Sequence, residues 1–175
     1  MARDPLSFAC RCSAFRGHIR AQPKATYVQC FCDTCRKVHA HLTQETVSEV
    51  HLLLSVPDAL QIDAGQDKLA ALTASGKGPI RWFTSCCNTP VANTLRSAKL
   101  PFMSFQTLLL SDDVALGRPR ALINQPDNKG TKGGAVMAFG VATRMLSSRL
   151  TGRWKDTPFF DAENAPTATP QRLKL

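Results

Sequence analysis

The sequence has no long hydrophobic segment, and this absence bears on where the protein works. No stretch of the 175-residue chain approaches the roughly 20 consecutive apolar residues that a membrane-spanning helix requires. The opening residues, MARDPLSFACRC, also lack the long apolar region of a secretory signal. We therefore expect a cytoplasmic protein with no membrane partner.

Aromatic residues are scarce too, and this limits how the positive charge can be interpreted. The chain carries 22 Lys and Arg against 13 Asp and Glu, a net charge of +9 that favours an anionic partner. The basic residues form no dense block, however, and one Tyr and two Trp leave few side chains for base stacking. Nucleic acid is therefore an unlikely main partner, and an anionic small molecule satisfies the charge equally well.

Cysteine, by contrast, is abundant, with seven residues. In a reducing compartment cysteines more often bind metal or act as thiols than form disulfides, and the odd number agrees with this. A chain of this length buries enough apolar surface to fold without disulfides. We expect a single domain over residues 1–175.

The first 110 residues are dominated by short apolar and β-branched segments separated by Gly, Pro, Asn and Asp. Such segments are typical of antiparallel strands joined by turns. They read ATYVQCF, VHLLLSV, ALQIDA, IRWFTS, PVANTL and FMSFQTLLL. We predict a mainly β protein whose motif-bearing part covers about residues 5–125.

The last third differs in character and predicts a helix. DNKGTKGG is a polar, glycine-rich segment that we expect to be a loop. The following AVMAFGVATRMLSSRLTGRW predicts an amphipathic helix, which together with an extended surface tail, ENAPTATPQRLKL, covers about residues 133–175. A helix packed on the sheet is favoured over an interfacial or partner helix. Its expected apolar stripe consists of Met137, Val141, Met145, Leu146, Leu150 and Trp154.

The cysteines fall into three groups, whose spacing suggests metal binding. The groups are Cys10 with Cys12, then Cys30, Cys32 and Cys35, and finally Cys86 with Cys87. Structural zinc takes four N or S ligands in a tetrahedron, commonly from close pairs. Residues i and i+2 of a strand point to the same face, so a C-x-C pair can present both sulfurs to one ion. The simplest assignment joins the first group to Cys87, with Cys86 as a further candidate, and builds a second site on the middle group.

The two predicted sites differ in ligand number. The first can reach four ligands, whereas the second has three cysteines, and a zinc ion with three protein ligands keeps a position for water or substrate. His39 or His41 is an alternative fourth ligand that would close the second site. A redox pair of Cys32 and Cys35, or inert buried thiols, are further alternatives.

The segments FACRC, VQCFCDTCRK and IRWFTSCCNTPV resemble the motifs of the glutathione-dependent formaldehyde-activating enzyme family, which includes the relatives of centromere protein V. The family pattern is C-x-C, then C-x-C-x-x-C-R, then F-C-x-x-C-G-T/S-P, and the resemblance covers about residues 8–95. It implies a β-tent (Mss4-like) zinc fold. It also implies a closed structural site joining Cys10 and Cys12 to the third motif, and a labile zinc at Cys30, Cys32 and Cys35 linked to glutathione.

The resemblance also implies an activity, in which glutathione adds to formaldehyde. An open zinc position suits the Lewis-acid role of binding the thiolate or polarising the aldehyde. We therefore expect one or two zinc ions per chain, glutathione as a possible co-substrate, and a carbon–sulfur lyase acting on a glutathione adduct or small aldehyde. Cys30, Cys32 and Cys35 would hold the catalytic zinc. The alternative is a non-catalytic zinc-binding module that contacts protein or nucleic acid.

The third motif departs from the family pattern. Thr84 stands where the family has its first cysteine, Asn88 stands where it has glycine, and Cys86 is additional. Neighbouring residues of an extended chain point in different directions, so Cys86 can share an ion with Cys87 only if the backbone turns there. The sequence leaves open whether Cys86 or a substitute completes the first site.

Overall fold

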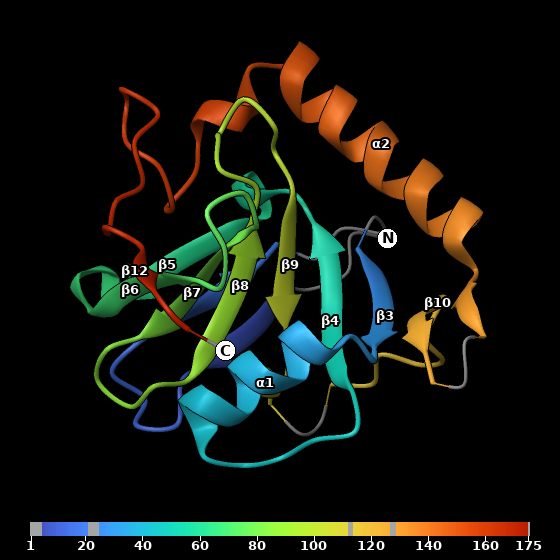
Figure 1. Cartoon of the computed structure of the whole chain (residues 1–175). Coiled ribbons are helices and arrows are strands. Elements are labelled where there is room, and N and C mark those ends of the chain that lie inside the picture. Colours follow the sequence, from blue (N-terminus) through green and yellow to red (C-terminus); the bar gives the residue numbers. More distant parts are fainter. Residues whose placement is uncertain (1–4, 21–24, 112–113, 127–128, 175) are drawn as a thin grey trace.

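The strands of the described residues form two sheets (Figure 1). The computed structural model describes residues 5–20, 25–111, 114–126 and 129–174. Within them a small antiparallel sheet has the order β1 (Leu6–Ala9), β2 (Arg16–Ile19), β5 (Leu60–Ala64). The order of the large sheet is β11 (Gly130–Lys132), β10 (Ala121–Gln125), β3 (Thr26–Cys30), β4 (Val50–Ser55), β9 (Met103–Gln106), β8 (Pro90–Thr94), β7 (Ile80–Thr84), β6 (Leu69–Thr73), β12 (Gln171–Arg172).

The prediction of a mainly β chain is confirmed. Each of the six predicted segments contains a strand, namely β3, β4, β5, β7, β8 and β9. The pairings among β3, β4, β9, β8, β7 and β6 are antiparallel, as expected. Two parallel pairings, β10 with β3 and β12 with β6, add later segments of the chain to the two edges of this antiparallel set.

Alternation along the strands of the large sheet divides its side chains between two faces. In β4, Leu53 belongs to the main core, which includes Phe8 and Phe15 from the region of the small sheet. Leu52 and Leu54 point the other way and join a second apolar cluster with Val28. This period of two is what a strand imposes. One face of the large sheet therefore packs toward the small sheet, and the other carries the helices.

The helix α1 (Asp33–Thr43) follows directly after β3, and the sequence did not predict it. Its N-cap residue is Cys32, which makes no side-chain capping hydrogen bond, so the usual start signal of a Ser, Thr, Asp or Asn is missing. Val38 and Leu42 pack against Leu72 of β6. The helix thus lies across the large sheet (Figure 1).

The predicted C-terminal helix is present as α2 (Gly134–Leu150), but its apolar stripe was predicted only in part. Met137 and Val141 pack on the β3–β4 side of the sheet, and Met145 contacts the main core. Leu146 and Leu150 are 60% and 79% exposed, so their assignment to the stripe was wrong. Leu146 lies nine residues after Met137, about two and a half helical turns, and therefore faces the opposite side. No helix of the described part is long and apolar enough to cross a bilayer.

The chain after α2, from Trp154 onward, also contacts the body of the protein. Trp154 lies in a 3₁₀ turn after α2 and contacts the main core. Phe159 and Phe160, which precede the predicted tail, enter the core against Trp82. In the tail itself Gln171–Arg172 form β12 beside β6, and the described tail residues are exposed or half-buried, so the prediction of an extended surface tail agrees with the structure.

The predicted glycine-rich loop over residues 127–134 was wrong in part. Gly130–Lys132 form the edge strand β11, which pairs with β10, whereas residues 127 and 128 lie outside the described part. Gly133 has a φ of 76°, and a Cβ placed there would lie 2.2 Å from the carbonyl oxygen of Arg120. Glycine is thus required where the chain leaves the sheet to start α2.

The C-terminal attachment gives a first prediction. Phe159 is fully buried, so Phe159→Ala should lower the free energy of unfolding by about 3–5 kcal/mol, measured in urea. Phe139→Ala is the matched control, because Phe139 is 73% exposed and its removal should change the stability by less than about 0.5 kcal/mol. Equal effects of the two substitutions would contradict the packing described.

Candidate metal centres

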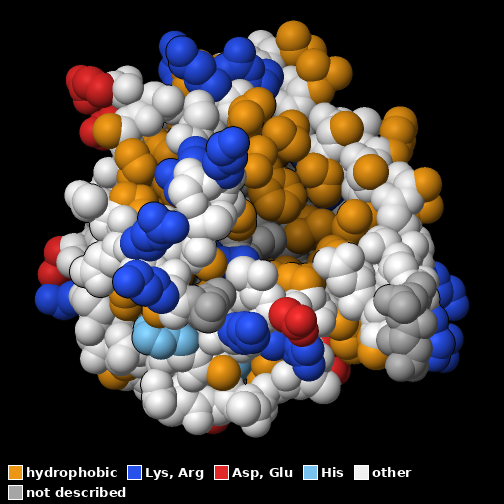
Figure 2. All heavy atoms as spheres, in the orientation of Figure 1, with side chains coloured by type: hydrophobic (Ala, Val, Ile, Leu, Met, Phe, Trp, Pro, Cys, Tyr) orange, Lys and Arg blue, Asp and Glu red, His pale blue; other side chains and the backbone are white. Residues whose placement is uncertain are grey.

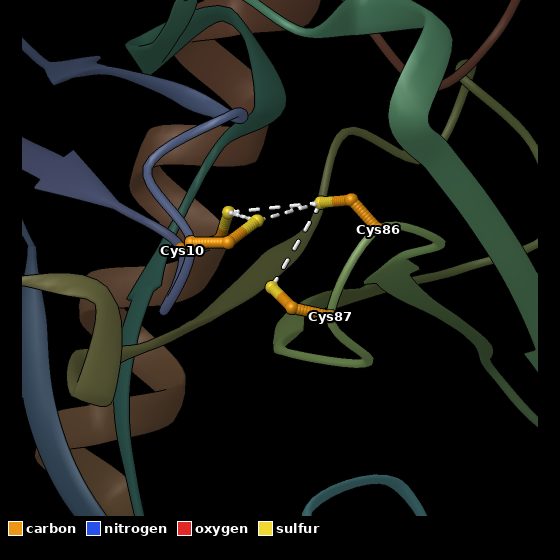
Figure 3. Close-up of side chains that lie close together, drawn as sticks. Cys10, Cys86 and Cys87 are labelled. Atoms are coloured by element: carbon orange, nitrogen blue, oxygen red, sulfur yellow. Dashed lines mark hydrogen bonds between the residues drawn. The ribbon is translucent and has the colours of Figure 1, made fainter.

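The first cysteine group brings together four sulfurs from two distant turns (Figure 3). The Cys10 sulfur lies 3.6 Å from that of Cys12 and 3.8 Å from that of Cys86. The Cys86 sulfur lies 3.3 Å from that of Cys12 and 3.8 Å from that of Cys87. All four sulfurs lie within 4.8 Å of one another. A tetrahedral zinc ion with Zn–S bonds of about 2.3 Å separates its sulfurs by about 3.8 Å, so the donor set fits such an ion.

The backbone between β7 and β8 makes the turn that Cys86 needs. Asn88 has a φ of 53°, its N–H donates to the carbonyl of Thr84 at 2.8 Å, and Thr84 N–H donates to the carbonyl of Thr89 at 3.0 Å. Asparagine tolerates this left-handed conformation, which explains how it stands where the family pattern has glycine. Both cysteines of the turn therefore reach the same group, and Cys86 brings the number of sulfurs to four.

Thr84, which stands where the motif of the similar family has a cysteine, contacts this site without supplying a sulfur. Its hydroxyl lies 3.3 Å from the Cys87 sulfur, and the Thr89 hydroxyl lies 3.1 Å from the same sulfur. Burial raises the pKa of Cys87, but these hydroxyl hydrogen bonds together with hydrogen bonds from Cys12 outweigh burial and lower the pKa to about 5. Burial and the neighbouring Cys12 thiol raise the pKa of Cys86 to about 12. The two adjacent cysteines thus differ in charge before any metal binds.

The second group lies where β3 meets α1. Cys30 ends β3, Cys32 is the N-cap of α1, and Cys35 lies in its first turn. The Cys30 thiol donates to the sulfurs of Cys32, at 3.3 Å, and Cys35, at 3.8 Å. All three sulfurs lie within 4.8 Å of one another. A strand end followed by a helix start therefore gathers the three thiols that the sequence analysis assigned to the second site.

One thiolate is concentrated at Cys32. Hydrogen bonds from the thiols of Cys30 and Cys35 lower the pKa of Cys32 to about 2, and they raise the pKa of Cys30. The backbone N–H of Cys35 also favours the Cys32 thiolate. The N-terminus of α1 contributes positive partial charge at this position. The site thus holds negative charge ready for a cation.

Histidine does not join this group. Within the described residues, the sulfurs of Cys30, Cys32 and Cys35 gather without a histidine, acidic group or fourth cysteine. Burial lowers the pKa of His39, whose Nδ1 atom is buried without a hydrogen-bond partner. The predicted alternative of a site closed by His39 or His41 therefore finds no support in the arrangement.

Arg81 is a functional candidate that the sequence analysis missed. It is 6% exposed, and its Nη1 donates to the Cys35 sulfur at 3.8 Å and to Asn93 Oδ1 at 3.1 Å. Asn93 in turn donates to the hydroxyl of Ser104 at 2.8 Å. The three residues are direct neighbours across β7, β8 and β9, so they form one polar row on the helix side of the sheet. This row ends at the three-cysteine group.

Two hollows flank the three cysteines. The apolar hollow, about 300 Å³ in volume, is lined by Cys35, Arg81, Asn93 and Ser104 and by apolar side chains of β4, β10 and α2. Figure 2 shows hydrophobic side chains lining a hollow on the face that carries α2. The polar hollow, about 400 Å³, lies beside Cys32 and includes Arg36, Ser48 and Asn124. The three-cysteine group is thus accessible from two chemically different sides.

The metal capacity of both groups gives a second prediction. Protein purified without added metal or chelator should contain two zinc ions per chain, measured by atomic emission. Cys86→Ala and Cys35→Ala should each lose one ion, because each removes a sulfur from a different group. Ser85→Ala is the control and should keep both, since the Ser85 hydroxyl donates to the carbonyl of Lys68. Two zinc ions in Cys86→Ala would show that Cys86 is no ligand.

Arg81 gives a third prediction. Replacing the buried guanidinium in Arg81→Met should weaken zinc binding at the second group by about 10–100-fold, the usual effect of losing a partner of a metal ligand. Competition with a chromogenic chelator would measure this affinity. Arg96→Met removes the same charge from an exposed position that contacts the carbonyl of Gly78, and it should bind zinc normally. Equal weakening by both variants would mean that only net charge matters.

Comparisons with known proteins place the chain in a family without assigning an activity. No curated protein matches the sequence. A structural-genomics crystal structure of a Rhodobacter sphaeroides protein superposes with a TM-score of 0.45 and 14% identity, over 63% of this chain and 92% of that one. Membership of the glutathione-dependent formaldehyde-activating family stays a prediction. The model of a family of unknown function matches residues 3–128, which include all seven cysteines but not α2. The chain therefore belongs to that family, DUF6151.

Proposed function

We propose that the protein is a zinc enzyme that forms or cleaves the carbon–sulfur bond between a thiol and a small aldehyde. The observation that carries this proposal is the convergence of Cys30, Cys32 and Cys35 beside two hollows, with no further ligand gathered among the described residues. Three thiolates suit zinc and leave one coordination position free. When bound, zinc would supply Lewis-acid stabilisation of a thiolate or of the aldehyde oxygen.

The reaction needs no oxidant or reductant. In the direction of synthesis, the thiol sulfur forms a bond to the carbonyl carbon, the C=O double bond becomes a single bond, and the thiol proton is transferred to the oxygen. The lyase direction reverses each change. Glutathione and formaldehyde are the pair that the sequence motifs predict, and the apolar surroundings of Cys35 also suit other thiols.

Arg81 would make this chemistry easier by balancing charge. Three thiolates and one divalent ion leave a net negative charge, which the buried guanidinium beside Cys35 offsets. A substrate thiolate adds a further negative charge, and a nearby cation favours the ionised form of a thiol. The polar row from Ser104 through Asn93 holds Arg81 in place for this role.

The first cysteine group would serve structure. Its four sulfurs join the turn after β1 to the turn between β7 and β8, and Arg11 N–H donates to the Thr89 hydroxyl between the same two turns at 3.3 Å. A zinc ion with four cysteine ligands keeps no position for substrate. One closed and one open site, on two sheets of mainly antiparallel strands, supports assignment to the β-tent (Mss4-like) type.

A cobalt-substituted protein tests the proposal. Cobalt bound by thiolates has visible and near-ultraviolet absorption that changes when a further sulfur binds. We predict that glutathione or a simple thiol increases the thiolate-to-cobalt absorption by about one additional sulfur, and that the protein accelerates exchange between thiol, formaldehyde and their adduct. Both effects should be lost in Cys35→Ala. The first group has four sulfurs and should not respond.

The same experiment separates the proposal from its alternative. A metal at the second group that accepts no thiol, combined with no acceleration of exchange, would contradict an enzyme. The protein would then be a zinc-binding module in which both metals are structural. Cys86→Ala serves as the matched control, because it alters the first group and should leave the thiol response of the second intact.

A further inference from the structure

The apolar hollow beside Cys35 has a composition that bears on the identity of the thiol. Its walls include Leu52 and Leu54 from β4 and Ile123 from β10, and its polar side chains are Cys35, Arg81, Asn93 and Ser104. A volume of about 300 Å³ lies at the lower limit of typical ligand pockets, which are mostly apolar with a few placed polar groups. The hollow therefore suits a compact apolar group.

The polar side chains of the hollow form hydrogen bonds with one another, although the Arg81 Nε atom is buried without a partner among the described residues. Asn93 accepts from Arg81 and donates to Ser104, and Arg81 also donates to the Cys35 sulfur. Among the described residues, the lining contains one cation, Arg81, and no carboxylate. Glutathione carries two carboxylates and one ammonium group, and burying these charges without partners is strongly unfavourable. An apolar chain gains free energy in the same space.

One wall of the hollow comes from α2, which lies beyond the part of the chain that the family model matches. Met137, Ala138 and Val141 form this wall. Two hydrogen bonds fix the helix against the body of the protein: Arg144 Nη2 donates to Thr26 Oγ1 at 2.8 Å, and Ser148 Oγ donates to Asp58 Oδ1 at 2.8 Å. The fold therefore holds α2 in position, and the space between α2 and Cys35 limits the size of a ligand in the hollow.

From this arrangement we infer that the substrate is a compact apolar thiol, whose carbon chain occupies the apolar hollow while its sulfur lies at the three-cysteine site. This inference rests on the proposed function and names its substrate class. Glutathione would have to bind instead through the polar hollow beside Cys32, where Arg36 is already paired with Asp33. The apolar hollow thus suits an apolar thiol, whereas a charged thiol such as glutathione would need the polar hollow.

A series of straight-chain thiols, from ethanethiol to hexanethiol, tests the inference on the cobalt-substituted protein. Dissociation constants come from the increase in thiolate-to-cobalt absorption, which measures binding and not turnover. Each methylene that enters an apolar site should tighten binding about fourfold, until the hollow is full. Butanethiol and longer members should bind more tightly than glutathione.

Two variants of the same helix provide the matched pair. Ala138→Phe places a ring in the wall of the hollow, so the gain per methylene should end at a shorter chain. Ala142→Phe adds the same ring at an exposed position outside the lining and should leave the series unchanged. Cobalt content and circular dichroism would establish that both variants fold and bind metal.

The outcomes separate the inference from the proposed function. A flat chain-length series, or glutathione binding more tightly than every alkanethiol, would overturn the inference while leaving a thiol-binding metal site intact. An unchanged series in Ala138→Phe would show that α2 does not bound the thiol site and would also overturn it. If no thiol changes the spectrum, the proposed function fails and the inference fails with it.

Discussion

Like charges at the cysteine groups are the constraint on which the site depends. Sulfurs 3.3–3.8 Å apart cannot all be thiolates without a cation among them, which is why hydrogen bonds among the three thiols of the second group raise the pKa of Cys30 and lower that of Cys32. A divalent ion removes this conflict by replacing the shared protons. Metal binding would then also stabilise the contacts between elements. The first group links two turns whose cysteines Cys10 and Cys86 are 76 residues apart, and the second links β3 to α1.

One face of the large sheet packs the main core, and the other face carries the polar row and the three-cysteine group. Side chains such as Leu53, Trp82 and Phe105 fill the core on one face, and the residues between them in the same strands face the helices. On that second face, Arg81, Asn93 and Ser104 replace apolar residues and lead to Cys35. Burying a guanidinium is costly unless an opposite charge accompanies it. The nearby Cys32 thiolate, whose pKa the charge of Arg81 helps to lower, supplies that charge, so the arginine and the cysteine group are each explained by the other.

The sequence predicted the parts of this arrangement that depend on local spacing. The strands followed from short alternating segments, and the two cysteine groups followed from their close pairs. The place of Cys86 could not be predicted, because it depends on the left-handed backbone of Asn88 and on a turn that the chain makes only in the folded sheet. The sequence did not predict helix α1, because its N-cap position is Cys32 and not one of the usual capping residues. The stripe of α2 was misjudged because Leu146 fits a local spacing but lies half a turn from Met137.

Arg81 illustrates a different limit of sequence reasoning. Each member of its polar row lies in a short strand beside apolar residues: Arg81 between Ile80 and Trp82, Asn93 between Ala92 and Thr94, Ser104 between Met103 and Phe105. Such a residue can indicate a surface-facing position as readily as a buried site. Only the register of three separate strands shows that the three side chains are neighbours, and that register depends on contacts distant in the sequence.

The position of the three-cysteine group between two unlike hollows has a chemical consequence. A reaction that joins a thiol to an aldehyde must admit two molecules, and it benefits when water is kept from the reacting atoms. The apolar hollow, one wall of which is α2, provides surroundings in which the attraction between Arg81 and a thiolate is stronger than in water. The polar hollow beside Cys32 provides a second approach that leaves this apolar surface undisturbed. Because α2 forms a wall of only the first hollow, changes in this helix would alter the thiol specificity that we propose while the cysteines keep their arrangement.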